Sequence, residues 1–107
     1  MMTHQDIDRR SLALHRLAVE KIRNNPALFE VVRDNLAKMR QETNQNTKSY
    51  LDEWENHLKS GLETVLSVAE EDSYHARCLR QASPFAGVLT EEERLTFLKK
   101  WKEEHAN

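Results

Sequence analysis

The segment from Arg77 to Trp101 reads RCLRQASPFAGVLTEEERLTFLKKW. It contains the clearest signals in the chain for where one helix ends and the next begins. The residue before Pro84 is pushed out of the helical region of backbone space, which predicts that one helix ends here. Gly87 can take backbone angles that other residues avoid. Thr90 and Glu93 have the spacing of a capping box, in which each side chain accepts a hydrogen bond from the other residue's amide. A new helix is therefore predicted to begin just after Thr90.

Residues 83–89, which we call the connector, read SPFAGVL and join these two helices. Exposed connections are usually polar, whereas large apolar side chains gain free energy when they leave water. We therefore expect the connector to be buried and to act as a clasp between the last two helices.

The chain of 107 residues is predicted to be all-α, a single small helical domain of about five helices spanning residues 1–107. Only two glycines and two prolines are present, and no segment alternates β-branched with polar residues as a strand would. Hydrophobic residues make up 38% of the chain, which is enough for a modest helical core. The predicted helices span residues 6–24, 26–41, 49–70, 73–82 and 91–104.

Apolar residues recur at helical spacing through each predicted helix, so each has one face that should point inward. Asn25 is a good capping residue and Pro26 suits the first helical position, which predicts a tight joint between the first two helices. The predicted inward residues are Ile7, Ser11, Leu14, Leu17, Ala18 and Ile22, then Leu28, Phe29, Val32, Leu36 and Met39, then Leu51, Trp54, Leu58, Leu62, Val65 and Ala69, then Tyr74, Cys78 and Leu79, and finally Leu95, Phe97, Leu98 and Trp101.

Two central segments allow more than one interpretation. Residues 41–49 read QETNQNTKS, contain no apolar side chain and are predicted to form an exposed loop. Gly61 interrupts the third helix, which either continues through it at a cost of about 1 kcal/mol relative to Ala or divides into two helices. The apolar phase is unbroken across Gly61, so a single helix is favoured.

Composition bounds the cellular setting and the partners. Cys78 is the only cysteine, which excludes an internal disulfide and fits a reducing compartment. The N-terminal residues lack the apolar run of a signal peptide, and no stretch approaches about 20 apolar residues, so a cytoplasmic protein with no membrane partner is expected. Residues 50–72 hold one Lys or Arg against seven Asp or Glu, whereas residues 1–49 hold nine against six. This segregation suits either helix-to-helix complementarity within the chain or a basic partner surface, and it argues against a continuous contact with nucleic acid.

No catalytic residue, metal site or cofactor is predicted. His75 and Cys78 are three residues apart on one helical face, but a structural zinc ion takes four ligands and there is no second cysteine. Neighbouring carboxylates such as Glu70 and Glu71 point in different directions along a helix, which favours a solvated acidic face over an acid–base pair. Nucleophile-elbow, phosphate-loop and HExxH motifs are absent from the sequence, so we expect no enzymatic activity.

The predicted partner-binding residues form two groups. The first is a polar rim around an aromatic side chain, the composition of many interface hot spots. The second is the acidic face of the central helix. In an alternative reading, the arginines of the first group bond the last carbonyls of their own helix and pair with that acidic helix. The residues are Arg77, Arg80, Gln81, Ser83 and Phe85 in the first group and Glu53, Glu55 and Glu70 in the second.

Two segments of the chain carry a family resemblance. They are HRLAVEKIRNNPALFEVVRDNL, from His15 to Leu36, and RQASPFAGVLTEEER, from Arg80 to Arg94. The chain resembles a group of short bacterial proteins that share an Arg-Gln-x-Ser-Pro-Phe-Ala-Gly-Val-Leu tail and are often encoded in toxin–antitoxin-like gene pairs. The resemblance covers most of residues 15–101 and implies an antitoxin-like partner protein without a catalytic residue.

The expected function is therefore that of an antitoxin, which neutralises a partner toxin enzyme by direct binding. The expected toxin acts on nucleotides or RNA. Two alternatives stay open from the sequence. One is a DNA-binding regulator of its own operon, which would use residues 26–41 (PALFEVVRDNLAKMRQ) as its recognition helix. The other is a structural homodimer whose apolar helix faces exceed what one copy can bury.

Overall fold

The computed structural model describes residues 3–42 and 44–105, and within these ranges the regular structure is helical, with no strand. The predicted all-α class is confirmed, but the described residues form six α-helices rather than about five. The elements are α1 (His4–Asn24), the 3₁₀ turn η1 (Pro26–Leu28), α2 (Phe29–Glu42), α3 (Gln45–Ser60), α4 (Leu62–Ala69), α5 (Tyr74–Arg80) and α6 (Glu91–His105).

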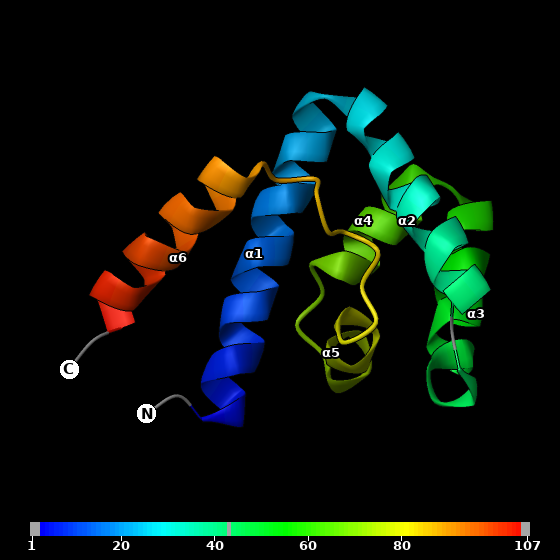
Figure 1. Cartoon of the computed structure of the whole chain (residues 1–107), viewed down its shortest axis with the longest axis horizontal. Helices are drawn as coiled ribbons and strands as arrows, with labels where there is room; N and C mark the ends of the chain where they lie inside the picture. The colour runs from blue at the N-terminus through cyan, green and yellow to red at the C-terminus, as the bar shows by residue number, and fades with distance from the viewer. Residues whose placement is uncertain (1–2, 43, 106–107) are drawn as a thin grey trace.

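Helix α1 separates two parts of the molecule (Figure 1). On one side, α1 packs against η1, α4 and α5. Helix α3 packs instead against α2, α4 and α5. On the other side α1 contacts α6, which lies at the edge of the molecule. The result is a body of 42 × 31 × 23 Å in which α6 has far fewer neighbours than the other long helices.

Side-chain caps start two helices earlier than predicted. Thr3 and Asp6 form a capping box with both bonds at 3.1 Å, so α1 begins at His4 rather than at residue 6. Asn44 accepts from the amide two residues on at 2.9 Å, so α3 begins at Gln45 rather than at residue 49. The prediction of a loop over residues 41–49 is therefore wrong for the residues of this segment that the structure describes. Residue 43 lies outside the described residues. Polar side chains suit an exposed helix surface as well as a loop.

The predicted single helix over residues 49–70 is also wrong, because α3 ends at Ser60 and α4 begins at Leu62. Gly61 has φ +123° and ψ 169°, a combination that is essentially restricted to glycine. The helical phase of the apolar residues does not reveal this break, since Trp54 before it and Val65 after it are both buried in the same core.

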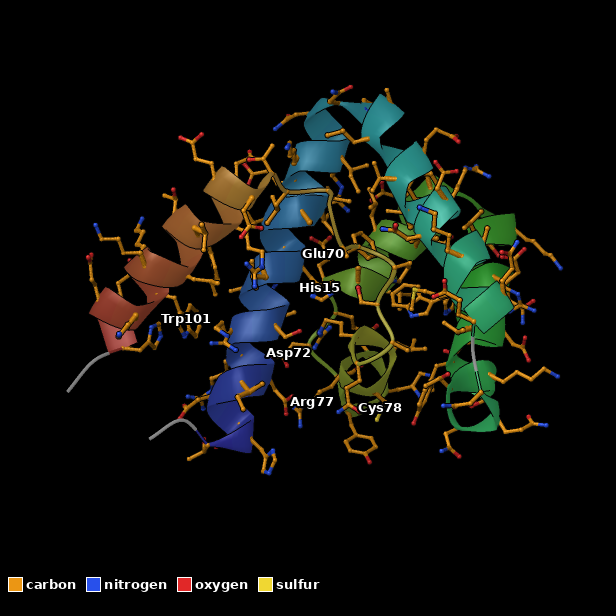
Figure 2. All side chains as sticks on the ribbon, viewed as in Figure 1. His15, Glu70, Asp72, Arg77, Cys78 and Trp101 are labelled. Carbon is orange, nitrogen blue, oxygen red and sulfur yellow. The ribbon has the colours of Figure 1, made fainter. Side chains whose placement is uncertain are left out.

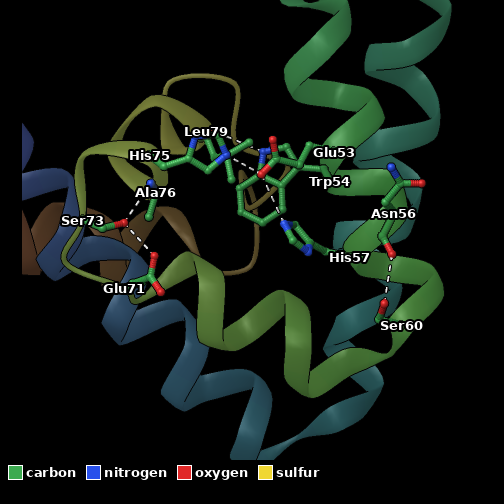
Figure 3. Close-up of polar contacts among 10 residues, drawn as sticks. All are labelled: Glu53, Trp54, Asn56, His57, Ser60, Glu71, Ser73, His75, Ala76 and Leu79. Atoms are coloured by element: carbon green, nitrogen blue, oxygen red, sulfur yellow. Dashed lines mark hydrogen bonds and ion pairs between the residues drawn. The ribbon is translucent and has the colours of Figure 1, made fainter.

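The core gathers residues from α1 to α5 and from the connector. Trp54 is fully buried, and its indole nitrogen donates to the carbonyl of Leu79 on α5 at 3.0 Å (Figure 3). Phe85 is 6% exposed, and its ring meets the rings of Trp54 and His15 edge-on, with centroids 6.0 and 5.5 Å apart. Val88 is fully buried nearby, so the connector supplies side chains to the core.

Polar side chains from α1 and α2 bind the backbone of the connector. Asn35 donates to the carbonyls of Pro84 and Ala86, at 2.9 and 2.6 Å. Lys21 donates to the carbonyl of Val88 at 3.0 Å. Two of these bonds are partly buried, so they replace water that the carbonyls of Pro84 and Val88 would otherwise bind, while the Ala86 carbonyl lies at the surface. They fix the connector so that Phe85 and Val88 point into the core.

The capping box at the start of α6 forms as predicted, with Glu93 accepting from the Thr90 amide at 2.8 Å and Thr90 accepting from the Glu93 amide at 3.1 Å. Glu93 also pairs with Lys21 on α1. The hydrogen bonds from Lys21 and from the Thr90 amide lower the pKa of Glu93 to about 2. This junction ties the first turn of α6 to α1.

Several predicted inward residues lie at the surface instead. No described residue of α6 is buried: Leu95 is 53% exposed, and Phe97 and Trp101 are only half-buried. Tyr74 is 76% exposed. Helical spacing groups these residues, but it does not show which positions a neighbouring element covers, and α6 packs mainly against α1. Ile7 and Leu17 are also exposed, although α1 packs against η1, α4, α5 and α6.

We expect the Phe85→Ala variant to lose about 3–5 kcal/mol of unfolding free energy, because a large aromatic side chain leaves a cavity in a close-packed core. Leu95→Ala is the matched control and should cost less than about 1 kcal/mol, since its side chain is exposed. Urea unfolding followed by circular dichroism measures both. Equal stability of the two variants would show that Phe85 is not a core residue.

Candidate functional site: the groove between α1 and α5

A groove of about 620 Å³ runs between the N-terminal half of α1 and the helix α5, and we call it the α1–α5 groove. Tyr50 on α3 also lines it. The residues that matter below are Ile7, Asp8, Tyr74, Arg77, Arg80 and Gln81. The groove therefore brings together three members of the predicted polar rim, which come from one end of α5, with α1 residues about 70 positions earlier in the chain.

Arg80 forms the inner wall of the groove and is 6% exposed. One terminal nitrogen, Nη1, donates to the carbonyls of Ala69 and Glu71 at 3.3 and 2.7 Å. These carbonyls belong to the last residue of α4 and to a residue just after it, where the helix dipole favours a cation. The alternative in which the arginines bond the last carbonyls of their own helix is therefore not observed, because Arg80 binds the end of α4 and Arg77 contacts Asp8 of α1.

The guanidinium of Arg80 is not matched by a carboxylate within 4 Å among the described residues. Its Nε atom is buried and has no hydrogen-bond partner among the residues that the structure describes. Burial lowers the pKa of Arg80 from its ordinary value, and the nearby carboxylate of Asp72 opposes that shift. The inner wall therefore carries a positive charge that the chain compensates with carbonyl dipoles.

Arg77 and Tyr74 form the outer part of the groove on α5. Arg77 lies between α5 and α1 (Figure 2), with Nε 3.7 Å from the carboxylate of Asp8. The pair is loose and partly exposed, so it contributes little to stability. Tyr74 and Ile7 of α1 are both exposed and both line the groove. A hydrogen bond with Cys78 raises the pKa of the Tyr74 phenol, so the ring is neutral near pH 7.

The structure separates the remaining predicted residues from this groove. Phe85 is a core residue and not an exposed anchor, which corrects that expectation. Ser83 is half-buried and hydrogen-bonded to His15, with Oγ and Nε2 2.7 Å apart. Gln81 lines the groove and is exposed. The polar rim is therefore centred on Tyr74 and not on Phe85.

The predicted acidic face is largely occupied by contacts within the chain. Glu53 lies between His75 and His57, with Oε2 2.6 and 3.4 Å from their Nε2 atoms (Figure 3). Glu70 pairs with Arg23 of α1 at 3.0 Å. Glu55 is half-exposed on α3. The acidic segment therefore serves helix-to-helix pairing, one of the two roles that its charge suggested.

His15 couples α1 to the connector beside the groove. The Ser11 carbonyl can only accept, so His15 Nδ1 donates to it at 2.7 Å, and Nε2 is left to accept from the Ser83 hydroxyl. Ser83 Oγ in turn accepts from the amide of Phe85 at 3.2 Å. Burial lowers the pKa of His15 from its ordinary value of 6.5, and Arg80 acts in the same direction. The network therefore uses the neutral imidazole.

Within residues 3–42 and 44–105, no three His, Cys, Asp or Glu side chains are placed to hold a metal ion together. In the same ranges, no helix combines the length and the apolar character needed to cross a membrane. Comparison of the chain with protein-family models, with curated proteins and with solved structures gave no match. The groove is therefore interpreted from its own chemistry.

Two residues of the site were missed by reasoning from the sequence. Tyr74 is predicted to point inward because it lies on one helical face with Cys78, but Cys78 is half-buried and Tyr74 is 76% exposed. Ile7 was assigned to the core by the same argument. The position of each near the end of its helix was the available signal, since helix ends tend to extend beyond the packed core.

Protonation of His15 should destabilise the fold. The native pKa is depressed, so as the pH falls below 6.5 the unfolded chain takes up a proton that the native state resists. The unfolding free energy should therefore fall with decreasing pH and level off below the native pKa. The His15→Gln variant should show a smaller fall over this range, as measured by urea unfolding at several pH values.

The comparison of slopes isolates His15, because the two proteins differ at that position alone. Glu93 affects the unfolding free energy in a different pH range. Its stabilising effect is lost as the pH falls from 4.5 toward its native pKa of about 2. Identical slopes for wild type and His15→Gln would show that the buried neutral imidazole does not contribute.

Proposed function

We propose that this chain is a cytoplasmic, antitoxin-like protein that binds a partner toxin enzyme through the α1–α5 groove. One observation carries the proposal: two exposed apolar side chains, Ile7 and Tyr74, flank the cations Arg77 and Arg80 in a single groove. Tyr and Arg are enriched among the residues that dominate protein–protein affinity. The resemblance to short antitoxin-like bacterial proteins supports the same class of function.

The chemistry of the groove indicates what the partner presents. Arg77 and Arg80 outnumber the single carboxylate of Asp8, so the groove favours an acidic side chain. An adjacent apolar side chain of the partner would rest on Tyr74 and Ile7. Arg80 is held by α4 and would act as a fixed charge, while Arg77 can exchange its loose contact with Asp8 for a closer pair. We propose Gln81 as an additional hydrogen-bonding group at the rim.

This proposal is favoured over recognition of DNA by α2. Two of the cations of α2, Arg33 and Arg40, pair with Glu30 and Asp52 of the chain itself, at 3.5 and 2.9 Å. A recognition helix would have to give up such contacts and would also bring its own carboxylates toward the phosphates. Binding in the groove requires only that Arg77 leave its 3.7 Å contact with Asp8, while Arg80 keeps its bonds to the end of α4.

The test is co-purification of the tagged protein with the toxin expected from the neighbouring gene, together with growth of cells that express both. We expect Arg77→Glu and Tyr74→Ala each to weaken the complex by about 2 kcal/mol or more, which is roughly thirtyfold in affinity. Both variants should also lose protection of growth. Their thermal stability should change little, because both side chains are largely outside the core.

Lys38→Glu is the matched control, since it reverses an exposed charge on α2 away from the groove. It should bind and protect as the wild type does. The proposal fails if the wild type forms no complex, or if both groove variants capture the toxin and protect cells as well as the control.

A further inference from the structure

The outward face of α6 is self-complementary, and this feature is independent of the α1–α5 groove. The inward face includes Glu93 and Phe97, which line a groove against Leu17 of α1. A helical residue turns by about 100° relative to the one before it, so the stripe opposite this inward face contains Glu91, Leu95, Leu98 and Lys102. No other helix lies beyond α6 on that side (Figure 1).

The four residues of this stripe are placed symmetrically about the middle of α6. In an antiparallel pair of identical helices, Leu95 of one copy faces Leu98 of the other, and Glu91 faces Lys102. Leu95 is 53% exposed, Leu98 is half-buried in the single chain, and the two charged residues at the ends are exposed. The two-fold arrangement thus places four leucines at the centre of the contact and one oppositely charged pair at each end.

The residues on either side of the stripe also complement each other under the same two-fold symmetry. On one flank, Glu92 of one copy lies near Lys99 of the other. On the other flank, Arg94 lies near Trp101, a pairing that allows a cation–π contact. Trp101 is only half-buried in the single chain, although its ring stacks on Phe97. The sequence order of α6, with acidic residues first and basic residues later, therefore suits its own antiparallel copy.

We propose that the outward face of α6 binds a second copy of this chain, with the two α6 helices antiparallel. The occupant is a second copy because the charge pattern and the leucine positions complement themselves. The stripe spans about 16 Å along one helix of each copy, so the interface lies at the low end of specific interfaces, below about 1,200 Å². We therefore expect a weak dimer and choose protein concentrations that reach the millimolar range to detect it.

Sedimentation equilibrium of the full chain, from about 1 μM to about 1 mM, measures this association directly. Leu95→Glu should weaken it at least about a hundredfold, because each dimer loses two leucine contacts and gains two charges at its centre. Glu91→Lys and Lys102→Glu, each alone, should weaken it several-fold. The double variant Glu91→Lys/Lys102→Glu should recover most of the affinity, because it restores opposite charges at both ends.

The double variant separates dimerisation from damage to the helix. Both charge reversals oppose the helix dipole. If association were lost only because α6 frays, the double variant would therefore associate more weakly than either single variant. Glu103→Lys is the control, since it makes the same charge change away from the stripe and should leave association unchanged. A wild type that stays monomeric at every concentration overturns the proposal, and so does a double variant that associates no better than the two single variants.

Discussion

The fold depends on fixing the backbone of an apolar connector that lies against the core, with Pro84, Phe85 and Val88 buried and Ala86 and Gly87 exposed. A segment without regular secondary structure leaves its carbonyl groups unpaired, and burying them without partners is costly. Here Asn35 and Lys21 donate to three of these carbonyls, and Ser83 accepts from the amide of Phe85. Because these bonds are in place, Phe85 and Val88 can complete the core that α1 to α5 share.

The same constraint shapes both proposed interaction surfaces. Arg80 lies at the end of α5 just before the connector, and its bonds to the end of α4 fix the inner wall of the α1–α5 groove. Beyond the connector, Lys21 and the Thr90 capping box hold the first turn of α6 against α1. The rest of α6 extends along the edge of the molecule and leaves its outward face uncovered (Figure 1). The connector thus lies between a groove on one side and an open helix on the other.

Local chemistry could be predicted from the sequence, and long-range packing could not. The helical class, the buried Trp54 and the capping box before α6 follow from spacing and capping rules. The break at Gly61 could not be assigned, because an unbroken apolar phase fits both a straight and a divided helix. Periodicity also cannot tell whether a stripe has a neighbour to cover it, which is why Tyr74 was misplaced. The groove joins α1 to α5 across some 70 residues, and no local pattern encodes that contact.

Amide hydrogen exchange at single-residue resolution tests the central claim, that the connector belongs to the core while α6 is held only at its first turn. The amides of Phe85 and Val88 bond within the connector, so they should exchange only through global unfolding, as the amides of α1 around Ile22 do. The amides of the second half of α6 should exchange much faster at protein concentrations where the chain is monomeric. Connector amides that exchange as fast as the end of α6 would contradict the account.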